Sequence, residues 1–505
     1  MQQLTPLDAW FINESDTEFQ HTCDIMIFDA EGPGLSLAEL RSVVEQRLHL
    51  LGPLRRRLVE VPFGIDEPYW IEDPDFDLAN HLFEESLPAP GGDRELADVT
   101  ARIASRHLDR SRPLWELHLI HGLDGGRTAL IKKFHHAAVD GASGLEITGI
   151  LLDSTPEPRE VPPPTEEWRP DPVPEEGELL MRGFAGAARR PMRMFDVYKR
   201  LENLPKPGEA ISSPTGDQSE DGGFLSAPEQ EVPPTPWNEK ISAERMVAFG
   251  PLVLGDFKDV KNKFGVTLND VVVAVCAGAV RRWLEERNAL PAEPLLVCVP
   301  ISVRTEEEKN LLGNRVSILV AEFPTHLDNP VERVRAAHES MKAAKEEHKA
   351  MGANLLGDIG ELMMPALQAR ANRVTASMDL PEEKPRWNLS ISNLPGSRVP
   401  LFLAGHRLQA HYPVGFALQR QGMMMTVASY IDTIGFGLIS DPKLVPDLWH
   451  LLDLVKNELQ QLMDQPVESS ATAPESTSAK KSTSAMKSTS AEDRSVDNAG
   501  QSAKS

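Results

Sequence analysis

Two adjacent histidines are the residues of this chain whose types and spacing best suit chemistry. His135 and His136 follow the run TALIKKF and precede, after three further residues, Asp140 and Gly141. An imidazole has a pKa near neutral without special tuning, so it is suited to act as a general base. Because side chains alternate across a strand, the two rings point in opposite directions and only one can face a cleft. Binding of one metal ion by both histidines is therefore unfavourable.

The full HHxxxDG string carries more weight than the histidine pair. A pair of histidines alone is more often structural or at the surface than catalytic. From ordinary residue frequencies, the whole string arises by chance in a chain of this length about once in a thousand cases. We therefore interpret the string as a catalytic motif.

Further short motifs are spread over the chain. They are Pro6-Leu7-Asp8 with Trp10-Phe11, Pro113-Leu114-Trp115, Asn269-Asp270 and Ser392-Asn393-Leu394-Pro395-Gly396. With these motifs, residues 1–465 resemble the bacterial wax ester synthase/diacylglycerol acyltransferase family. That family is a branch of the acyl-CoA-dependent acyltransferase superfamily, which includes chloramphenicol acetyltransferase and the nonribosomal condensation domains. HHxxxDG alone indicates the superfamily, and the other motifs indicate the narrower family.

The resemblance implies a base-catalysed acyl transfer. It makes His136 the general base, which takes the proton of an acceptor hydroxyl as that oxygen attacks the thioester of acyl-CoA. It makes Asp140 the ion-pair partner of an arginine, for which Arg304 and Arg315 are the candidates. No acyl-enzyme is required, and the chain has neither a GxSxG motif nor a cysteine near the histidines. We expect no metal and no cofactor, with acyl-CoA as a substrate.

Three residues near the base are expected to act structurally. By the alternation argument, His135 faces away from the cleft and supports the turn. Gly141 allows another part of the chain to approach closely. Trp115 is more typical of a core residue, because a Trp near the start of a strand usually packs.

Four polar residues are candidates for contacts with the substrate or the oxyanion. Asn269 could orient the substrate or donate to the developing oxyanion. Asp270 has two interpretations, because residues 267–270 also have the form of a helix capping box and a carboxylate in the first turn suits the helix dipole. Ser392 and Asn393 end a predicted strand and form a second candidate donor set.

The elements that must position these residues mix helical and strand periodicity. Helices are predicted at 35–50, 142–153, 267–290 and 331–349, and strands at 57–62, 68–73, 115–123, 128–136, 294–303, 387–395, 423–432 and 433–440. Helices interleave with strands in both halves. We therefore expect an α/β fold of two chloramphenicol acetyltransferase-like domains with mixed sheets, a long crossover linker, and an active-site tunnel at the domain interface.

Composition divides the chain into four parts. Residues 155–237 hold 16 of the 41 prolines together with acidic and Ser/Gly-rich stretches, which predicts a linker. Residues 466–505 lack Leu, Ile and aromatic residues and repeat Ser-Thr-Ser-Ala, which predicts a disordered tail. The two domains are therefore placed at residues 1–154, which carry HHxxxDG, and at residues 238–465.

Charge and composition exclude several classes of protein. A net charge of −24 argues against nucleic-acid binding, since neutralising a phosphate backbone needs clustered cations. The three cysteines are too scattered for a disulfide framework or a CxxC metal site, and they fit a reducing compartment. The chain shows no signal-peptide pattern and no run of about 18–20 apolar residues. We expect a cytoplasmic protein that is peripherally associated with a membrane or with lipid inclusions.

One segment of the linker, residues 179–201, reverses the charge of the chain. It carries six basic residues against one acid, interleaved with Met, Phe and Tyr. This pattern is typical of a helix lying in a membrane interface. A surface helix packed on the body and a clamp for the phosphates of CoA are the alternatives.

The resemblance implies an O-acyltransferase that moves a long acyl chain from acyl-CoA to a diacylglycerol or a long-chain fatty alcohol. The product would be triacylglycerol or wax ester. One alternative is an acyltransferase of the same superfamily that acts on a polyketide, sugar or peptide acceptor. Another is a non-enzymatic lipid-body binding or scaffold protein, against which the joint presence of His136, Asp140 and Gly141 argues.

Overall fold

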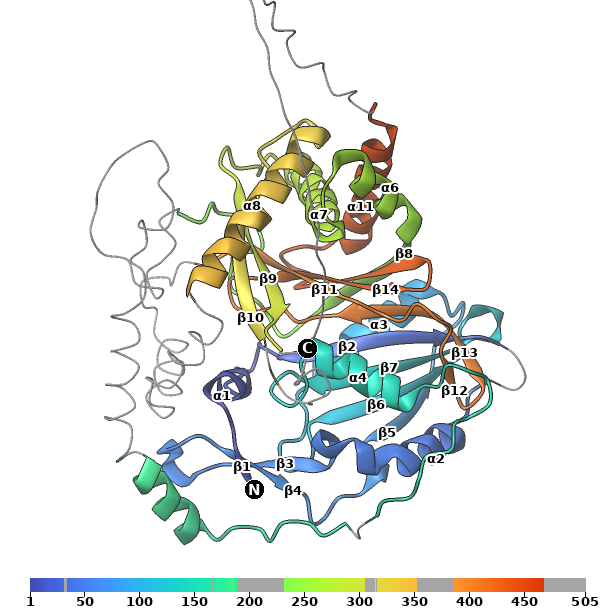
Figure 1. Cartoon of the computed structure of the whole chain (residues 1–505), viewed down its shortest axis with the longest axis vertical. Coiled ribbons are helices and arrows are strands. Elements are labelled where there is room, and N and C mark those ends of the chain that lie inside the picture. Colours follow the sequence, from blue (N-terminus) through green and yellow to red (C-terminus); the bar gives the residue numbers. More distant parts are fainter. Residues whose placement is uncertain are drawn as a thin grey trace, which may run out of the picture. The chain divides into compact units, whose positions relative to one another are not determined.

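Two six-stranded mixed sheets form the framework of the described part of the chain. The computed structural model describes residues 1–30, 34–165, 168–186, 188, 231–304, 314, 316–351 and 385–466. Figure 1 shows the two sheets one above the other. A smaller sheet consists of β1 (Gln2–Gln3), β4 (Tyr69–Glu72) and β3 (Arg56–Val59).

The first large sheet combines strands from both ends of the chain. In spatial order it consists of β12 (Phe402–Leu403), β13 (His406–Val414), β2 (His21–Phe28), β7 (Thr128–His135), β6 (Trp115–His121) and β5 (Leu82–Ser86). Only β5 and β6 are parallel neighbours. Strand β13 pairs with β2, so a segment that we assigned to the second domain completes the sheet of the first. The predicted boundary between residues 1–154 and 238–465 therefore does not separate the two sheets.

The second large sheet is built from the second half of the chain. In spatial order it consists of β10 (Val316–Phe323), β9 (Leu295–Ser302), β11 (Leu389–Leu394), β14 (Met423–Tyr430), β15 (Thr433–Ser440) and β8 (Met246–Val253). Strand β11 is parallel to both β9 and β14, and the other neighbours are antiparallel. Both large sheets are thus mixed, as predicted.

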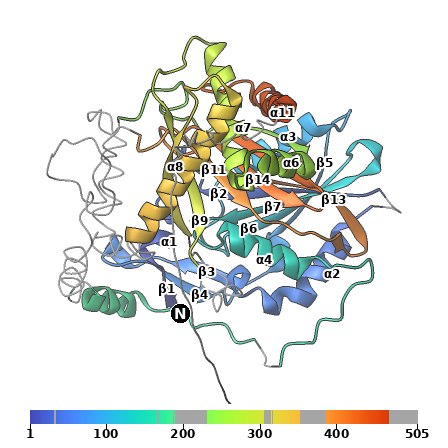
Figure 2. The same cartoon turned by 45° about the horizontal axis from the view of Figure 1, so that its top comes forward.

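Helices cover the sheets because their apolar faces need a partner. The helices of the second sheet are α6 (Leu254–Phe264), α7 (Leu268–Glu285), α8 (Pro330–Met351) and α11 (Leu448–Asp464). Helix α7 is apolar on nearly all sides, and it is enclosed by the sheet and by the other three helices in one hydrophobic core. Figure 2 shows these helices from the side that faces away from the first sheet.

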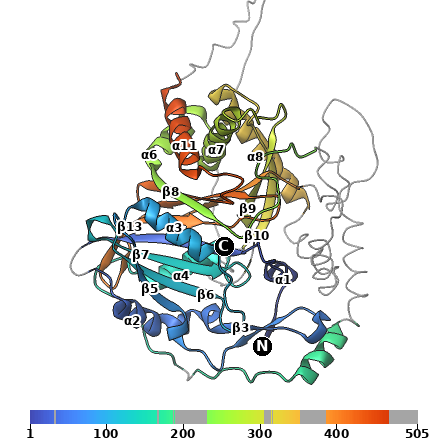
Figure 3. The ribbon, with the colours of Figure 1, turned by 180° about the vertical axis from the view of Figure 1, so that it is seen from behind.

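The first sheet carries the remaining helices. They are α1 (Pro6–Ile12), α2 (Leu37–Arg47), α3 (Asp93–Ala104) and α4 (Gly141–Leu151). Helices α2 and α4 share a core with one face of this sheet. Helix α3 contacts β2 of the first sheet and β8 of the second, and Figure 3 shows it near the junction of the two sheets. This arrangement joins the two sheets in one unit, residues 1–465.

The predicted helices and strands are present, but several further elements were not predicted. The predicted strand at 433–440 matches β15, and the predicted helix at 267–290 contains α7. The elements that were not predicted are β1, α1, β2, β5, α3, β8, α6, β10, β12, β13 and α11. The predictions for the tail, and those for linker residues 189–230, lie outside the described residues.

No single helix among the described residues is long and apolar enough to cross a membrane. Helices α6 and α7 taken together have the length and apolar composition of a membrane span, but they are bent by 101° relative to each other.

Candidate active site

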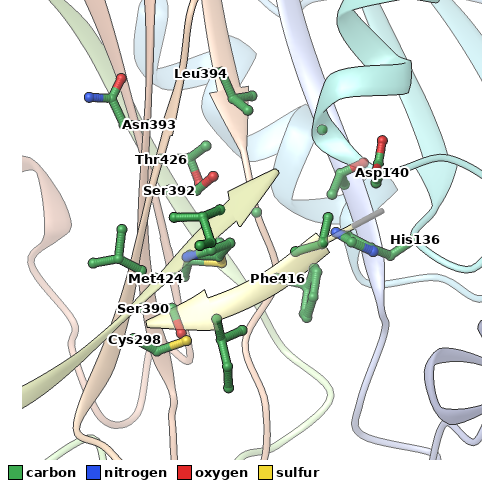
Figure 4. Close-up of a pocket in the computed structure, with 18 of the residues that line it drawn as sticks. His136, Asp140, Cys298, Ser390, Ser392, Asn393, Leu394, Phe416, Met424 and Thr426 are labelled. Carbon is green, nitrogen blue, oxygen red and sulfur yellow. The ribbon is translucent and has the colours of Figure 1, made fainter. Parts of the chain in front are cut away.

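A cavity of about 2070 Å³ is lined by residues of both large sheets. Six of the eight predicted site residues line it: His136, Asp140, Gly141, Asn269, Ser392 and Asn393. Figure 4 shows His136 and Asp140 at one side of this cavity and the residues of β11 and β14 across from them. His135 and Asp270 are not among the lining residues.

The imidazole of His136 is held between two aromatic rings. It stacks on Phe11, with ring centroids 4.2 Å apart, and meets Phe416 edge to face at 5.4 Å. Its backbone N–H donates to Gln20 O at 2.9 Å, and its carbonyl accepts from Asn314 Nδ2 at 2.6 Å. The ring is therefore fixed by packing, and the backbone is fixed by hydrogen bonds.

The environment of His136 favours the neutral imidazole. Burial lowers the pKa of His136 to about 4, although Asp140 and the residue's own carbonyl favour the protonated form. The Nδ1 atom is buried and has no hydrogen-bond partner among the described residues. At neutral pH the ring is therefore unprotonated and able to accept a proton.

His135 points away from the cavity, as the alternation of side chains predicts. Its Nδ1 accepts a hydrogen bond from the backbone N–H of Ala137 at 3.1 Å, which supports the turn. Its Nε2 lies 3.3 Å from Oε1 of Glu14. Burial lowers the pKa of His135, so this ring is also neutral at neutral pH.

Glu14 is the centre of a partly buried polar cluster behind the turn. His21 and His107 also contact its carboxylate, at 3.3 and 3.1 Å. Nearby histidines and the N–H of Gln20 hold the pKa of Glu14 well below its usual range despite its burial. The ligand atoms of Glu14, His21 and His107 lie within 4.8 Å of one another, a spacing that could hold a metal ion. The carboxylate is, however, already engaged by the Gln20 N–H at 2.6 Å and by Arg110.

Asp140 both begins α4 and pairs with an arginine. Its Oδ1 accepts from the backbone N–H of Ser143 at 2.8 Å, so it is the N-cap of the helix. The same atom accepts from Nη2 of Arg304 at 2.9 Å. The expected ion pair is therefore confirmed with Arg304, whereas the other candidate, Arg315, lies outside the described residues.

The expected close approach at Gly141 is also confirmed. A Cβ atom at this position would lie 2.9 Å from Cδ2 of Leu394. Leu394 belongs to β11 of the second sheet. The absence of a side chain at Gly141 thus lets the motif turn pack closely against that strand.

The structure separates the two residues of the Asn269-Asp270 pair. Asn269 lines the cavity, and its Oδ1 accepts a hydrogen bond from Nδ2 of Asn393 at 3.2 Å. Asp270 instead completes a capping box with Thr267 and contacts Nδ1 of His338 at 2.6 Å. These contacts support the structural interpretation of Asp270, whereas Asn269 and Asn393 remain candidates for substrate contacts.

Trp115 is a core residue, as predicted. It is almost completely buried, its Nε1 donates to Leu54 O at 2.7 Å, and its ring stacks on His81. It therefore supports β6 without reaching the cavity.

Two cysteines line the cavity, but neither is set up as a nucleophile. Burial raises the pKa of the Cys23 thiol and of the Cys298 thiol to about 12. A thiol with such a pKa is not ionised at neutral pH, and the thiolate is the reactive form. This supports the expectation that no acyl-enzyme forms.

Several residues of the site were not singled out from the sequence. Phe416 follows a strand that was not predicted, and Glu14 has no local signal as a partner of His135. Asn314 Nδ2 links the His136 carbonyl to Oδ1 of Asp8, which lies 306 positions away. Phe11 was recorded only as part of a motif. Long-range contacts of this kind leave no spacing pattern in a sequence.

Comparisons with known proteins identify the family of the chain. The family model described as the wax ester synthase/diacylglycerol acyltransferase catalytic domain matches residues 4–272, and the model of the C-terminal domain of that family matches residues 312–463. A Mycobacterium tuberculosis protein (strain CDC 1551) named as a diacylglycerol O-acyltransferase is 32% identical over 488 residues, covering 93% of this chain and 92% of its own.

Solved structures show the same fold. The wax ester synthase/diacylglycerol acyltransferase from Marinobacter aquaeolei VT8 is similar with a TM-score of 0.64 and 25% identity, covering 92% of this chain and 98% of its own. The starter condensation domain of rhizomide synthetase, in complex with C8-CoA and Leu-SNAC, is similar with a TM-score of 0.53 and 12% identity. The similarity covers 93% of this chain and 96% of that domain's chain. At that identity, the second similarity concerns the fold alone.

Proposed function

The chain belongs to the wax ester synthase/diacylglycerol acyltransferase family, and from this premise we propose that it transfers a long acyl chain from acyl-CoA to the hydroxyl of a diacylglycerol or a long-chain alcohol. The product is a triacylglycerol or a wax ester, and His136 is the general base. The observation that carries the proposal is the neutral, cavity-facing imidazole of His136, held between Phe11 and Phe416.

The chemical step needs one proton acceptor and no covalent enzyme intermediate. A ring nitrogen of His136 takes the proton of the acceptor hydroxyl while the oxygen attacks the thioester carbonyl of acyl-CoA. The tetrahedral intermediate then collapses, the carbon–sulfur bond breaks, and the imidazolium returns the proton to the departing CoA sulfur. Base catalysis of this kind contributes a factor of about 10²–10⁴, so positioning of the two substrates must supply much of the remaining acceleration.

The size and the lining of the cavity suit two long acyl chains. Its volume of about 2070 Å³ exceeds the range of about 300–1,000 Å³ that is typical of sites for small molecules. Apolar side chains such as Leu145, Ile318 and Met341 line it. An apolar lining stabilises alkyl chains by removing their surface from water.

Exposed cations at the lining are suited to the phosphates of CoA. Lys345, Arg386 and Arg398 are exposed and belong to the lining of the cavity. Because the net charge of the chain is −24, the negatively charged phosphates of CoA need a local basic region to bind. Changing Arg386 to Glu is expected to raise KM for acyl-CoA and to leave KM for the acceptor unchanged.

The proposal also includes contact with a lipid surface, where a diacylglycerol resides. The helical residues 176–186, the green helix at the lower left of Figure 1, lie against the loop that carries Phe63. Leu179 is buried there, while Phe63, Met181 and Phe184 are 85%, 72% and 62% exposed. Exposed aromatic and Met side chains beside a basic segment are typical of peripheral membrane binding.

Co-sedimentation with vesicles tests the lipid contact. The parent is expected to sediment with vesicles of phosphatidylcholine and phosphatidylglycerol, and Phe63→Ser with Phe184→Ser is expected to weaken this binding. Arg189→Glu, Arg190→Glu and Arg193→Glu, in the basic stretch that follows in the sequence, should weaken it further. Equal sedimentation of all three proteins would contradict the proposed contact.

Product analysis tests the activity itself. The protein is supplied with palmitoyl-CoA alone, with hexadecanol and with diolein, and both free CoA thiol and lipid products are measured. Thiol release that depends on an acceptor, together with formation of wax ester or triacylglycerol, is the expected result. Release that is the same without an acceptor would indicate a thioesterase, and no release would favour a binding or scaffold role.

A further inference from the structure

The cavity-facing side of the second sheet carries small polar side chains where aliphatic ones would be usual. Residues alternate along β11 and β14, so Leu389, Ile391, Met425 and Val427 enter the hydrophobic core beneath the helices. The residues between them line the cavity, namely Ser390, Ser392, Met424 and Thr426. This wall therefore presents hydroxyl groups to the cavity.

Two of these hydroxyls lie side by side. Ser392 of β11 is directly opposite Thr426 of the parallel neighbour β14. Adjacent strands lie about 4.8 Å apart, so both side chains can reach one ligand atom. Figure 4 shows Ser392 and Thr426 together on this wall, with His136 on the other side of the cavity.

The hydroxyl of Thr426 lacks a partner. Thr426 is 4% exposed, and its Oγ1 makes no hydrogen bond within the described residues. A buried hydroxyl without a partner is costly, so a polar ligand atom at this place would remove an existing penalty. Gly415 packs closely against this hydroxyl, and a Cβ there would lie 3.0 Å from Thr426 Oγ1 and 2.4 Å from Met424 Sδ.

We propose that Thr426 and Ser392 form a subsite that donates hydrogen bonds to an ester carbonyl oxygen of a diacylglycerol acceptor. The inference rests on the proposed function, in which the acceptor hydroxyl is held at His136. A diacylglycerol carries two ester carbonyls within a few bonds of that hydroxyl, whereas a fatty alcohol has only methylene groups there. The subsite therefore favours diacylglycerol, because a fatty alcohol would leave the buried hydroxyl of Thr426 unpaired.

The test compares two acceptors in variants that remove one hydroxyl each. Thr426→Val keeps the shape of the side chain, and Ser392→Ala changes a half-buried position, so at least one variant should remain folded. In each we expect kcat/KM for diolein to fall roughly 3- to 10-fold more than kcat/KM for hexadecanol, the effect of one hydrogen bond between neutral groups.

Two controls separate loss of the hydroxyl from general damage to the cavity. Thr426→Ser keeps the hydroxyl and should keep the preference of the parent for diolein over hexadecanol. Met424→Leu changes the same wall without removing a donor and should alter both acceptors alike, if at all. Because Thr426→Val removes an unpaired polar group, its midpoint of thermal unfolding should equal or exceed that of the parent.

Other outcomes would overturn the inference. An equal loss with both acceptors would place the hydroxyls at the thioester carbonyl, which the two reactions share. If the ratio of kcat/KM for diolein to kcat/KM for hexadecanol is unchanged in both Thr426→Val and Ser392→Ala, the two hydroxyls have no role in the choice of acceptor. A parent without acceptor-dependent thiol release would instead overturn the proposed function, so the two failures are distinguishable.

Discussion

Arg304 donates a hydrogen bond of 2.9 Å to Asp140, although 164 positions separate the two residues. The same Nη2 atom of Arg304 donates to Oγ of Ser143. Arg304 follows β9 of the second sheet, whereas Asp140 begins α4, which packs on the first. The pair therefore ties the two sheets together directly beside the turn that carries His136.

The Arg304–Asp140 pair is expected to contribute strongly to stability, because both side chains are almost fully buried. Replacing one partner leaves a buried charge without compensation. Arg304→Met should lower the free energy of unfolding by about 3–5 kcal/mol, measured by urea denaturation. The double variant with Asp140→Asn should lose less than the sum of the single losses. Arg41→Met, which breaks an exposed pair, is the control and should change stability by less than about 1 kcal/mol. Strict additivity would contradict the coupling.

The pH profile should report the neutral His136. Because burial lowers its pKa to about 4, the unprotonated ring persists well below the usual value of 6.5. We expect kcat/KM to remain level as the pH falls to about 5 and to decline through about 4. Circular dichroism at each pH should show that the protein stays folded. If kcat/KM instead declined around pH 6.5, the base would lie in a much more polar environment than the structure shows.

Glu14 should stabilise the fold in a pH-dependent manner. Since its pKa is lowered in the folded protein, its contribution is present above the usual carboxyl pKa of 4.5 and is lost as the pH falls below that value. Glu14→Gln should therefore be less stable than the parent at pH 7, and the difference should shrink below about pH 4.5. Unfolding curves from pH 3 to pH 7 measure this. A difference that is independent of pH would show that shape, and not charge, matters at this position.

Asn393 and Asp270 should affect different properties. If the amide of Asn393 donates to the oxyanion, Asn393→Ala should lower kcat by about 10²–10³ without loss of stability. Asp270→Ala should instead cost about 1 kcal/mol of stability through the loss of the capping box and should leave kcat of the folded fraction close to that of the parent. A large effect of Asp270→Ala on kcat at full folding would reverse the assignment.

Local rules allowed the motif turn to be predicted from the sequence. The alternation of side chains placed His135 and His136 on opposite sides of a strand end, and the structure confirms it. The capping pattern of residues 267–270 identified the start of α7, although it left the role of Asp270 open between capping and substrate contact. In each case the cause lies within a few residues along the chain.

What could not be predicted depends on residues that meet only in the folded chain. The contact of Phe416 with His136, the cluster around Glu14, and the pairing of Ser392 with Thr426 all join distant segments. The same is true of β13, which joins the first sheet from the far end of the sequence. Hydrophobic patterning indicates that a strand exists but not which strand it will pair with.

The most direct test of the account is the acceptor-dependent release of CoA thiol by His136→Ala. The variant should fold like the parent, as judged by circular dichroism, and should bind palmitoyl-CoA with similar affinity. With hexadecanol or diolein, its turnover should fall by about 10²–10⁴, the share that general-base catalysis supplies. Turnover of His136→Ala that stays close to that of the parent would contradict the central claim that this imidazole takes the proton.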